Sequence, residues 1–211
     1  MHWPNCRNVR DLAGLPIDGG GTVRPGALLR SDNLDQLTPE GLAAVDALGI
    51  ARIIDVRDVW ETQSYPSPYR ADPRWFNVPL NDPADPALDD EDLLVQYLAL
   101  LDNYPHRFAK ALTAIAEAPP GPVLVHCHAG RDRTGLVIAL TLAAIGVPAD
   151  AIAKDYATAP ADWEHDQPLA ATMHAVLSAR LPALPPTVLA GLKNRLSTEP
   201  AHQSPPAADA H

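Results

Sequence analysis

The sequence is poor in cysteine and has no long apolar run. Only Cys6 and Cys127 are cysteines among 211 residues. A secreted disulfide scaffold carries more cysteines, so we expect a reducing, cytoplasmic compartment. The longest apolar run, Leu136 to Val147, is too short to cross a bilayer, so stable membrane insertion is not expected. The first residues, MHWPNCRNVRD, lack the charged and then apolar layout of a signal peptide.

Lysine is also scarce, and the charge balance is acidic. The chain has 16 basic and 26 acidic residues, which gives a formal net charge of −10. This balance argues against nucleic acid or an anionic membrane as a general partner. Lys110, Lys154 and Lys193 are the only lysines, and the other basic residues are arginines. Arginine suits phosphate because its planar fork binds two oxygens, although solvated surface arginine is an equally simple explanation.

Hydrophobic periodicity predicts strands that alternate with helices. Strands are expected at 50–56, 75–80 and 123–126, and helices at 39–48, 89–101, 106–118 and 134–145. Two or three further helices are expected between residues 149 and 196. The order predicts an α/β fold with a central, mostly parallel sheet flanked by helices. We expect one domain over residues 1–196 and a disordered tail over 197–211, which is rich in Pro, Ala and polar residues.

The most informative segment is HCHAGRDRTG at residues 126–135, which joins the strand at 123–126 to the helix that follows. A strand–loop–helix unit of this kind aims the free N–H groups and dipole of the helix into the loop, where they can hold a phosphate dianion. The same environment favours a thiolate, so Cys127 is the candidate nucleophile. Arg133, six positions later, can bind two phosphate oxygens. Thr134 can donate its hydroxyl to the Cys127 sulfur, and no metal or cofactor is required.

Two simpler explanations of this segment were weighed. A single cysteine before a helix is usually a small core residue. The histidines on either side of Cys127 suggest zinc, but neighbouring residues of an extended segment point to opposite sides and the usual ligand spacings are absent. The combined spacing of Cys, Arg, Thr and two glycines favours the phosphate-binding loop.

This loop resembles the signature of the protein tyrosine and dual-specificity phosphatases, and most of all a bacterial branch whose loop reads HCxxGKDRTG. Four further blocks are similar to that branch: 8–14 (NVRDLAG), 24–32 (RPGALLRSD), 48–61 with Asp55, Arg57 and Glu61, and 146–156 ending in Asp155-Tyr156. The resemblance implies the phosphatase fold and a phosphocysteine mechanism. It implies that Cys127 is the nucleophile, that Arg133 holds the phosphate, and that His126 orients the loop and favours the thiolate.

The remaining loop residues are expected to bind phosphate or substrate: His128, Ala129, Gly130, Arg131 and Thr134. Arg131 stands where the branch usually has lysine, and a basic residue there is associated with phosphoinositide as well as phosphotyrosine hydrolysis. His128 is equally well explained as a solvent-facing spacer. Asp55 and Arg57 end a buried strand at the edge where ligands bind, and we interpret them as supports of the site, with a plain salt bridge as the alternative.

The general acid has two candidates. Asp132 lies inside the loop beside Arg133, and Asp82 follows the strand expected at 75–80, where the wider superfamily carries a mobile acid. A positioned acid contributes about 10² to 10⁴ in rate. We favour Asp132 as the acid. Its alternative role is to hold the loop or an arginine in place, and the alternative role of Asp82 is that of a turn residue before Pro83.

The sequence therefore predicts a phosphatase acting on phosphotyrosine, with phosphoserine/threonine or phosphoinositide as further substrates. A small-molecule phosphatase for inositol phosphates or nucleotides is the alternative. A pseudophosphatase that binds phosphorylated partners is disfavoured because Cys127, Arg133 and Thr134 are all present. Cys6 could protect Cys127 through a reversible disulfide, although an incidental thiol is the simpler interpretation.

Overall fold

A five-stranded sheet organises the chain in the computed structural model, which describes residues 1–81, 84, 91–158, 169–180 and 183–198. The strands are β1 (Arg10–Asp11), β2 (Leu28–Ser31), β3 (Arg52–Asp55), β4 (Trp75–Asn77) and β5 (Val123–His126). Their spatial order is β1-β2-β5-β3-β4. Only the β1–β2 pair is antiparallel; β2, β5, β3 and β4 run parallel. The predicted α/β fold with a mostly parallel sheet is therefore confirmed.

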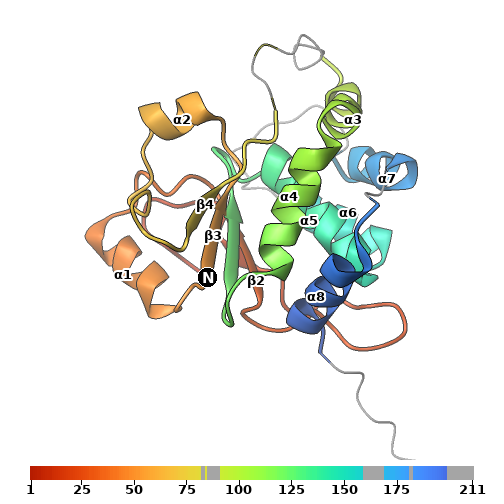
Figure 1. Cartoon of the computed structure of the whole chain (residues 1–211), viewed down its shortest axis with the longest axis horizontal. Helices are drawn as coiled ribbons and strands as arrows, with labels where there is room; N and C mark the ends of the chain where they lie inside the picture. Colours follow the sequence, from red (N-terminus) through yellow and green to blue (C-terminus); the bar gives the residue numbers. More distant parts are fainter. Residues whose placement is uncertain (82–83, 85–90, 159–168, 181–182, 199–211) are drawn as a thin grey trace, which may run out of the picture.

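Helices cover both faces of this sheet. Their bounds are α1 (Pro39–Ala47), α2 (Val59–Ser64), α3 (Leu93–Asn103), α4 (Pro105–Ala116), α5 (Asp132–Ile145), α6 (Ala149–Ala157), α7 (Leu169–Ala179) and α8 (Pro186–Leu196). Figure 1 shows α1 on one side of the sheet, with α2 beyond one end of β3 and β4, and α3 to α8 on the other side. None of the helices in the described residues is long and apolar enough to span a membrane.

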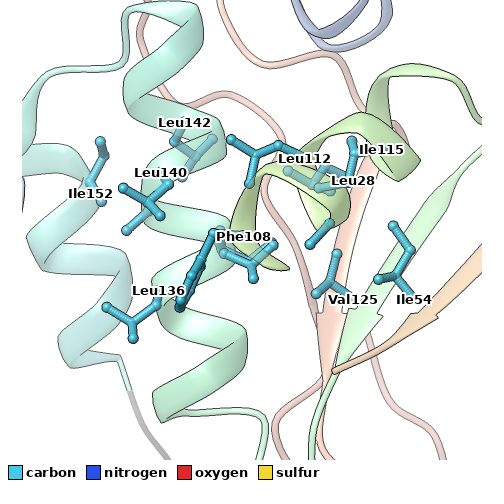
Figure 2. Packing of buried hydrophobic residues seen from close by; sticks show 14 of the residues in the cluster. Leu28, Ile54, Phe108, Leu112, Ile115, Val125, Leu136, Leu140, Leu142 and Ile152 are labelled. Carbon is cyan, nitrogen blue, oxygen red and sulfur yellow. The ribbon is translucent and has the colours of Figure 1, made fainter. Parts of the chain in front are cut away.

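The central strands are buried on both faces, as their near-continuous apolar sequences predict. Alternate residues point to opposite sides. Leu124 packs with Leu29 and Ile53 in a smaller cluster beneath α1. Val125 joins Leu28 and Ile54 in the main core. Figure 2 shows these last three against side chains of α4, α5 and α6: Phe108, Leu112, Ile115, Leu136, Leu140, Leu142 and Ile152.

The predicted elements occur with shifted ends, and local chemistry explains two of the shifts. The helix expected at 89–101 begins at Leu93, because the Asp92 carboxylate accepts the Leu94 N–H at 2.8 Å and caps it. Residues 89 and 90 lie outside the described part of the chain. The helix expected at 106–118 already starts at Pro105, whose missing N–H costs nothing in the first turn. Gly146 ends α5 in the left-handed conformation, at φ 93°.

The chain after α8 returns to the N-terminal segment. Thr198 donates its N–H to the Thr22 carbonyl at 2.8 Å, and Ser197 forms an isolated bridge with Val23. The first two residues of the expected tail are therefore attached to the domain. The rest of that tail, 199–211, lies outside the described residues.

Candidate active site

The loop that carries Cys127 lies at the centre of the sheet edge. Strand β5 is flanked by β2 and β3 and ends at His126, so Cys127 is the first residue beyond it. Helix α5 begins at Asp132 and directs its first N–H groups back toward the loop. Cys127 is buried, with 2% of its surface exposed. The predicted strand–loop–helix unit is thus present, with the thiol at the junction between strand and loop.

Three consecutive carbonyl groups of the loop are tied to the surrounding scaffold. The His128 carbonyl accepts the backbone N–H of Asn33 at 2.8 Å. Asn8 Nδ2 donates to the carbonyls of Ala129 at 3.2 Å and Gly130 at 2.9 Å. In a planar trans peptide the N–H points opposite to the C=O. The N–H groups of Ala129, Gly130 and Arg131 therefore turn away from these anchors, which is the arrangement of an anion-binding nest.

A buried arginine strengthens this anchoring. Arg30 donates Nη2 to the Gly130 carbonyl at 2.7 Å and Nη1 to Asp155 Oδ2 at 2.7 Å. Arg10 donates Nε to Asp155 Oδ1 at 2.8 Å. Arg30 is 1% exposed, so its charge depends on Asp155 for compensation. A carboxylate from α6 and an arginine from β2 thus hold the loop backbone from behind.

The N-terminal segment is fixed by a second carboxylate. Asp32 Oδ1 accepts the backbone N–H of Arg7 at 2.8 Å, that of Asn8 at 3.1 Å, and the Cys6 thiol at 2.8 Å. Burial, followed by the negative charge of Asp32, raises the pKa of the Cys6 thiol. Cys6 is therefore held as a protonated donor, and both cysteines are free thiols in the structure. This arrangement favours a structural role for Cys6 over redox protection of Cys127.

Two glycines of the loop motif are required by close packing. Gly130 has φ 67°, and a Cβ there would lie 2.2 Å from the Ser31 carbonyl oxygen. A Cβ on Gly135 would lie 2.5 Å from the ring of Tyr156. Both approaches are far inside van der Waals contact, so the loop and the start of α5 can sit against β2 and α6 only with glycine at these positions.

Arg133 is oriented by two acidic residues, Asp58 at the N-cap of α2 and Glu61 within this helix. Its guanidinium makes a two-point contact with Glu61, in which Nη2 donates to Oε1 at 2.9 Å and Nη1 donates to Oε2. Asp58 Oδ2 lies 3.8 Å from Nη1. Burial favours a raised pKa for Glu61, but the hydrogen bond and charge of Arg133 outweigh it and lower that pKa. The Arg133 side chain keeps 19% of its surface exposed.

Asp132 is held by two donors on a single oxygen. Its Oδ1 accepts the Tyr97 hydroxyl and, at 2.9 Å, Arg131 Nε. The hydroxyls of Tyr97 and Tyr156 are 2.5 Å apart. Burial and the nearby Asp132 raise the pKa of both tyrosines, so they stay protonated as donors. About a third of the Asp132 side chain is exposed, at 34%. The other candidate acid, Asp82, lies outside the described residues.

His126, Asp55 and Arg57 form a buried group behind the loop. Arg57 binds Asp55 through Nη2 and Oδ2 at 2.6 Å and through Nε and Oδ1 at 2.9 Å. His126 Nδ1 lies 3.2 Å from the Cys127 carbonyl oxygen, whereas its Nε2 is 3.6 Å from Asp55 Oδ2. Burial lowers the pKa of His126. A neutral imidazole with its proton on Nδ1 would donate to the Cys127 carbonyl. His126 would then hold the loop backbone in position without supplying a positive charge to the Cys127 thiolate.

Thr134 and His128 differ in exposure. Thr134 is fully buried, and within the described part of the chain its Oγ1 has no hydrogen-bond partner. His128 is exposed, and its ring meets the exposed Tyr65 edge-to-face with centroids 5.5 Å apart. Arg131 is committed to Asp132, as described above.

Sequence reasoning missed several residues that hold the loop: Asn8, Arg30, Asn33, Glu61, Tyr97, Asp155 and Tyr156. Most of them belong to the blocks at 8–14, 24–32, 48–61 and 146–156, so the motif order signalled their importance without revealing their contacts. Asn33 and Tyr97 lie outside those blocks, and no sequence pattern marked them.

Comparison with known proteins places the chain among phosphatases. The model of the tyrosine phosphatase family matches residues 1–202. A putative tyrosine-protein phosphatase of Cupriavidus necator is 30% identical over 74% of this chain and 61% of its own length. The triple specificity protein phosphatase PtpB of Mycobacterium tuberculosis is 32% identical over 72% of this chain and 66% of its own length. The alignments thus span less than two thirds of these relatives.

Proposed function

Since this chain belongs to the tyrosine phosphatase family, we propose that it hydrolyses phosphotyrosine monoesters through a phosphocysteine intermediate on Cys127. The observation that carries the proposal is the loop itself. Its carbonyl groups are bound by Asn8, Arg30 and Asn33, so that successive N–H groups turn away from these anchors and are available to an anion. Such a nest holds a tetrahedral dianion without a metal.

In the first step the Cys127 thiolate attacks phosphorus, and the bond from phosphorus to the ester oxygen breaks. Arg133 binds two of the phosphoryl oxygens and stabilises their charge during transfer. The Glu61 contact supports this role because it fixes the plane of the guanidinium before substrate arrives. The nest of Ala129, Gly130 and Arg131 also binds the phosphoryl oxygens, through backbone N–H groups.

Asp132 is proposed to give its proton to the leaving oxygen and then to take one from the water that attacks phosphocysteine. Its exposure supports the assignment, and so does the use of only one carboxylate oxygen by Tyr97 and Arg131. Asp82 is the alternative acid. Thr134 is proposed to donate Oγ1–H to the sulfur as it leaves, because this buried hydroxyl has no hydrogen-bond partner within the described residues.

An aromatic phosphate ester is the favoured substrate because aromatic rings stand beside the loop. The exposed Tyr65 and His128 rings are in edge-to-face contact and can flank a phenyl ring above the nest. Phosphoserine, phosphothreonine and phosphoinositide are proposed as secondary substrates. We further propose that the protein acts in the cytoplasm on phosphorylated proteins.

The test is a panel of substrates at equal concentration. A phosphotyrosine peptide, the same peptide with phosphoserine or phosphothreonine, an inositol phosphate and a nucleotide monophosphate would be compared by phosphate release. The proposal expects the highest kcat/KM for phosphotyrosine. A preference for inositol phosphate or nucleotide would instead assign the protein to small-molecule phosphatases.

A further inference from the structure

A cleft beside the catalytic loop is not used by the mechanism above. It has a volume of about 520 Å³ and lies between the start of α2 and the first two turns of α4. Asp58 and Trp60 come from the α2 side, Asn81 from the segment after β4, and His106, Arg107 and Lys110 from α4.

The cleft adjoins the phosphate site through Asp58. This residue lines the cleft, and its Oδ2 lies 3.8 Å from Arg133 Nη1. Asn81 Nδ2 donates to the same Oδ2 at 3.2 Å. Helix α2 therefore forms a wall of the cleft through Asp58 and holds the phosphate-binding arginine through Glu61. A ligand larger than one phosphoryl group can therefore contact the phosphate site at Arg133 and the cleft at the same time.

One wall of the cleft is cationic. His106, Arg107 and Lys110 face it from α4. Arg107 donates Nη1 to the Asn81 carbonyl at 2.5 Å, and Lys110 Nζ lies 5.6 Å from the Phe76 ring. Within the described part of the chain neither forms an ion pair with a carboxylate, whereas Arg131 and Arg133 do. In a protein of net charge −10, a wall with two cations that form no ion pair among the described residues favours an acidic ligand.

The floor and the opposite wall have different chemistry. Asp58 Oδ1 and Asn81 Oδ1 are buried out of reach of a ligand, so these two side chains shape the cleft and do not bind in it through these atoms. Trp60 is an apolar surface that is 53% exposed. The indole suits an apolar side chain of a peptide, and the cationic wall suits a carboxylate. A phosphate ion alone would use only the cations and leave the exposed indole of Trp60 without a partner.

We propose that this cleft binds the peptide segment next to the phosphorylated tyrosine, with an acidic side chain against Arg107 and Lys110. This inference rests on the proposed function and names its substrate class as phosphotyrosine with flanking Asp or Glu. An apolar side chain of the same segment lies against the Trp60 indole.

The test compares two phosphotyrosine peptides that differ only in flanking residues, glutamates in one and glutamines in the other. Affinity is measured by fluorescence anisotropy with full-length Cys127→Ser protein, and kcat/KM with the wild type. An exposed ion pair contributes a factor of about 1.5 to 5, so two pairs, with Arg107 and with Lys110, should make the wild type favour the acidic peptide by roughly twofold to twenty-fivefold. Lys110→Glu should lower this ratio about fivefold, and Lys193→Glu, a charge reversal on α8, should not.

Each failure is distinct. If the ratio of affinity or kcat/KM between the acidic and the neutral peptide is near one, or is unchanged by Lys110→Glu, the proposed binding of acidic flanks in the cleft is wrong. Hydrolysis of the neutral peptide would still support the phosphatase activity. A Lys110→Glu effect on an inositol bisphosphate but not on the peptide ratio would make the occupant a small phosphate and overturn the proposal. No turnover of either peptide would sink the proposed function, and the anisotropy ratio would still decide whether the cleft binds acidic flanks.

Discussion

Asp155→Ala gives a quantitative test of how the loop that carries Cys127 is supported. Arg30 and Asp155 are 1% and 9% exposed and meet at 2.7 Å. Removing one partner of a buried ion pair costs about 3–5 kcal/mol, because the other charge stays buried without compensation. For a domain of 150–250 residues, where 1 kcal/mol shifts Tm by about 2–4 °C, this cost lowers Tm by roughly 6–20 °C.

Asp102→Ala is the matched control for this change. Asp102 also meets an arginine, Arg180, at 2.6 Å, but the two side chains are 47% and 50% exposed. An exposed pair contributes about 0–1 kcal/mol, so its loss should lower Tm by no more than about 4 °C. Circular dichroism melting of both variants measures the difference. Equal small shifts would refute the claim that the Arg30–Asp155 pair supports the loop.

Three more predictions address single contacts. Gly130→Ala should lower kcat/KM for p-nitrophenyl phosphate about 10²-fold, because the added Cβ would meet the Ser31 oxygen at 2.2 Å and displace the loop. A Gly130→Ala variant with the kcat/KM of the wild type would contradict this. Tyr97→Phe should reduce kcat roughly tenfold for esters with poor leaving groups, and less for p-nitrophenyl phosphate, if it positions Asp132 as the acid; equal losses across leaving groups would exclude that role. The pKa of His126 is lowered in the folded state, so the unfolded chain binds more protons below its own pKa of about 6.5. The free energy of unfolding should then fall by up to about 1.4 kcal/mol per pH unit as pH drops below 6.5, and denaturant titrations of His126→Gln should show a flatter pH dependence.

The fold was predictable where local pattern and tertiary structure agree. The apolar run at 123–126 and the glycine-containing loop after it identified β5 and the start of α5, and Gly146 with Pro148 marked the end of α5. The antiparallel strand β1 has only two residues, Arg10 and Asp11, and carries no periodicity that could reveal it. Strand β4 is shorter than expected and stops at Asn77.

The candidate site was predictable only in part, because a motif names residues but not their partners. The sequence placed Cys127 and Arg133 in one loop. It could not show that Glu61, seventy-two positions before Arg133, would hold the guanidinium. Nor could it show that Tyr97 contacts Asp132, because a tyrosine at a helical core position looks the same whether or not its hydroxyl has a partner. Contacts between distant segments arise from tertiary packing, which local sequence does not encode.

The central claim, a cysteine-dependent phosphatase, is tested most directly by p-nitrophenyl phosphate hydrolysis with the wild type and Cys127→Ser. The account predicts that wild-type turnover survives EDTA and is abolished by vanadate, and that Cys127→Ser is inactive while it keeps the wild-type Tm. Turnover by Cys127→Ser, or loss of wild-type activity in EDTA, would contradict a thiolate mechanism that needs no metal. A folded, reduced wild type without any turnover would contradict the enzyme assignment itself.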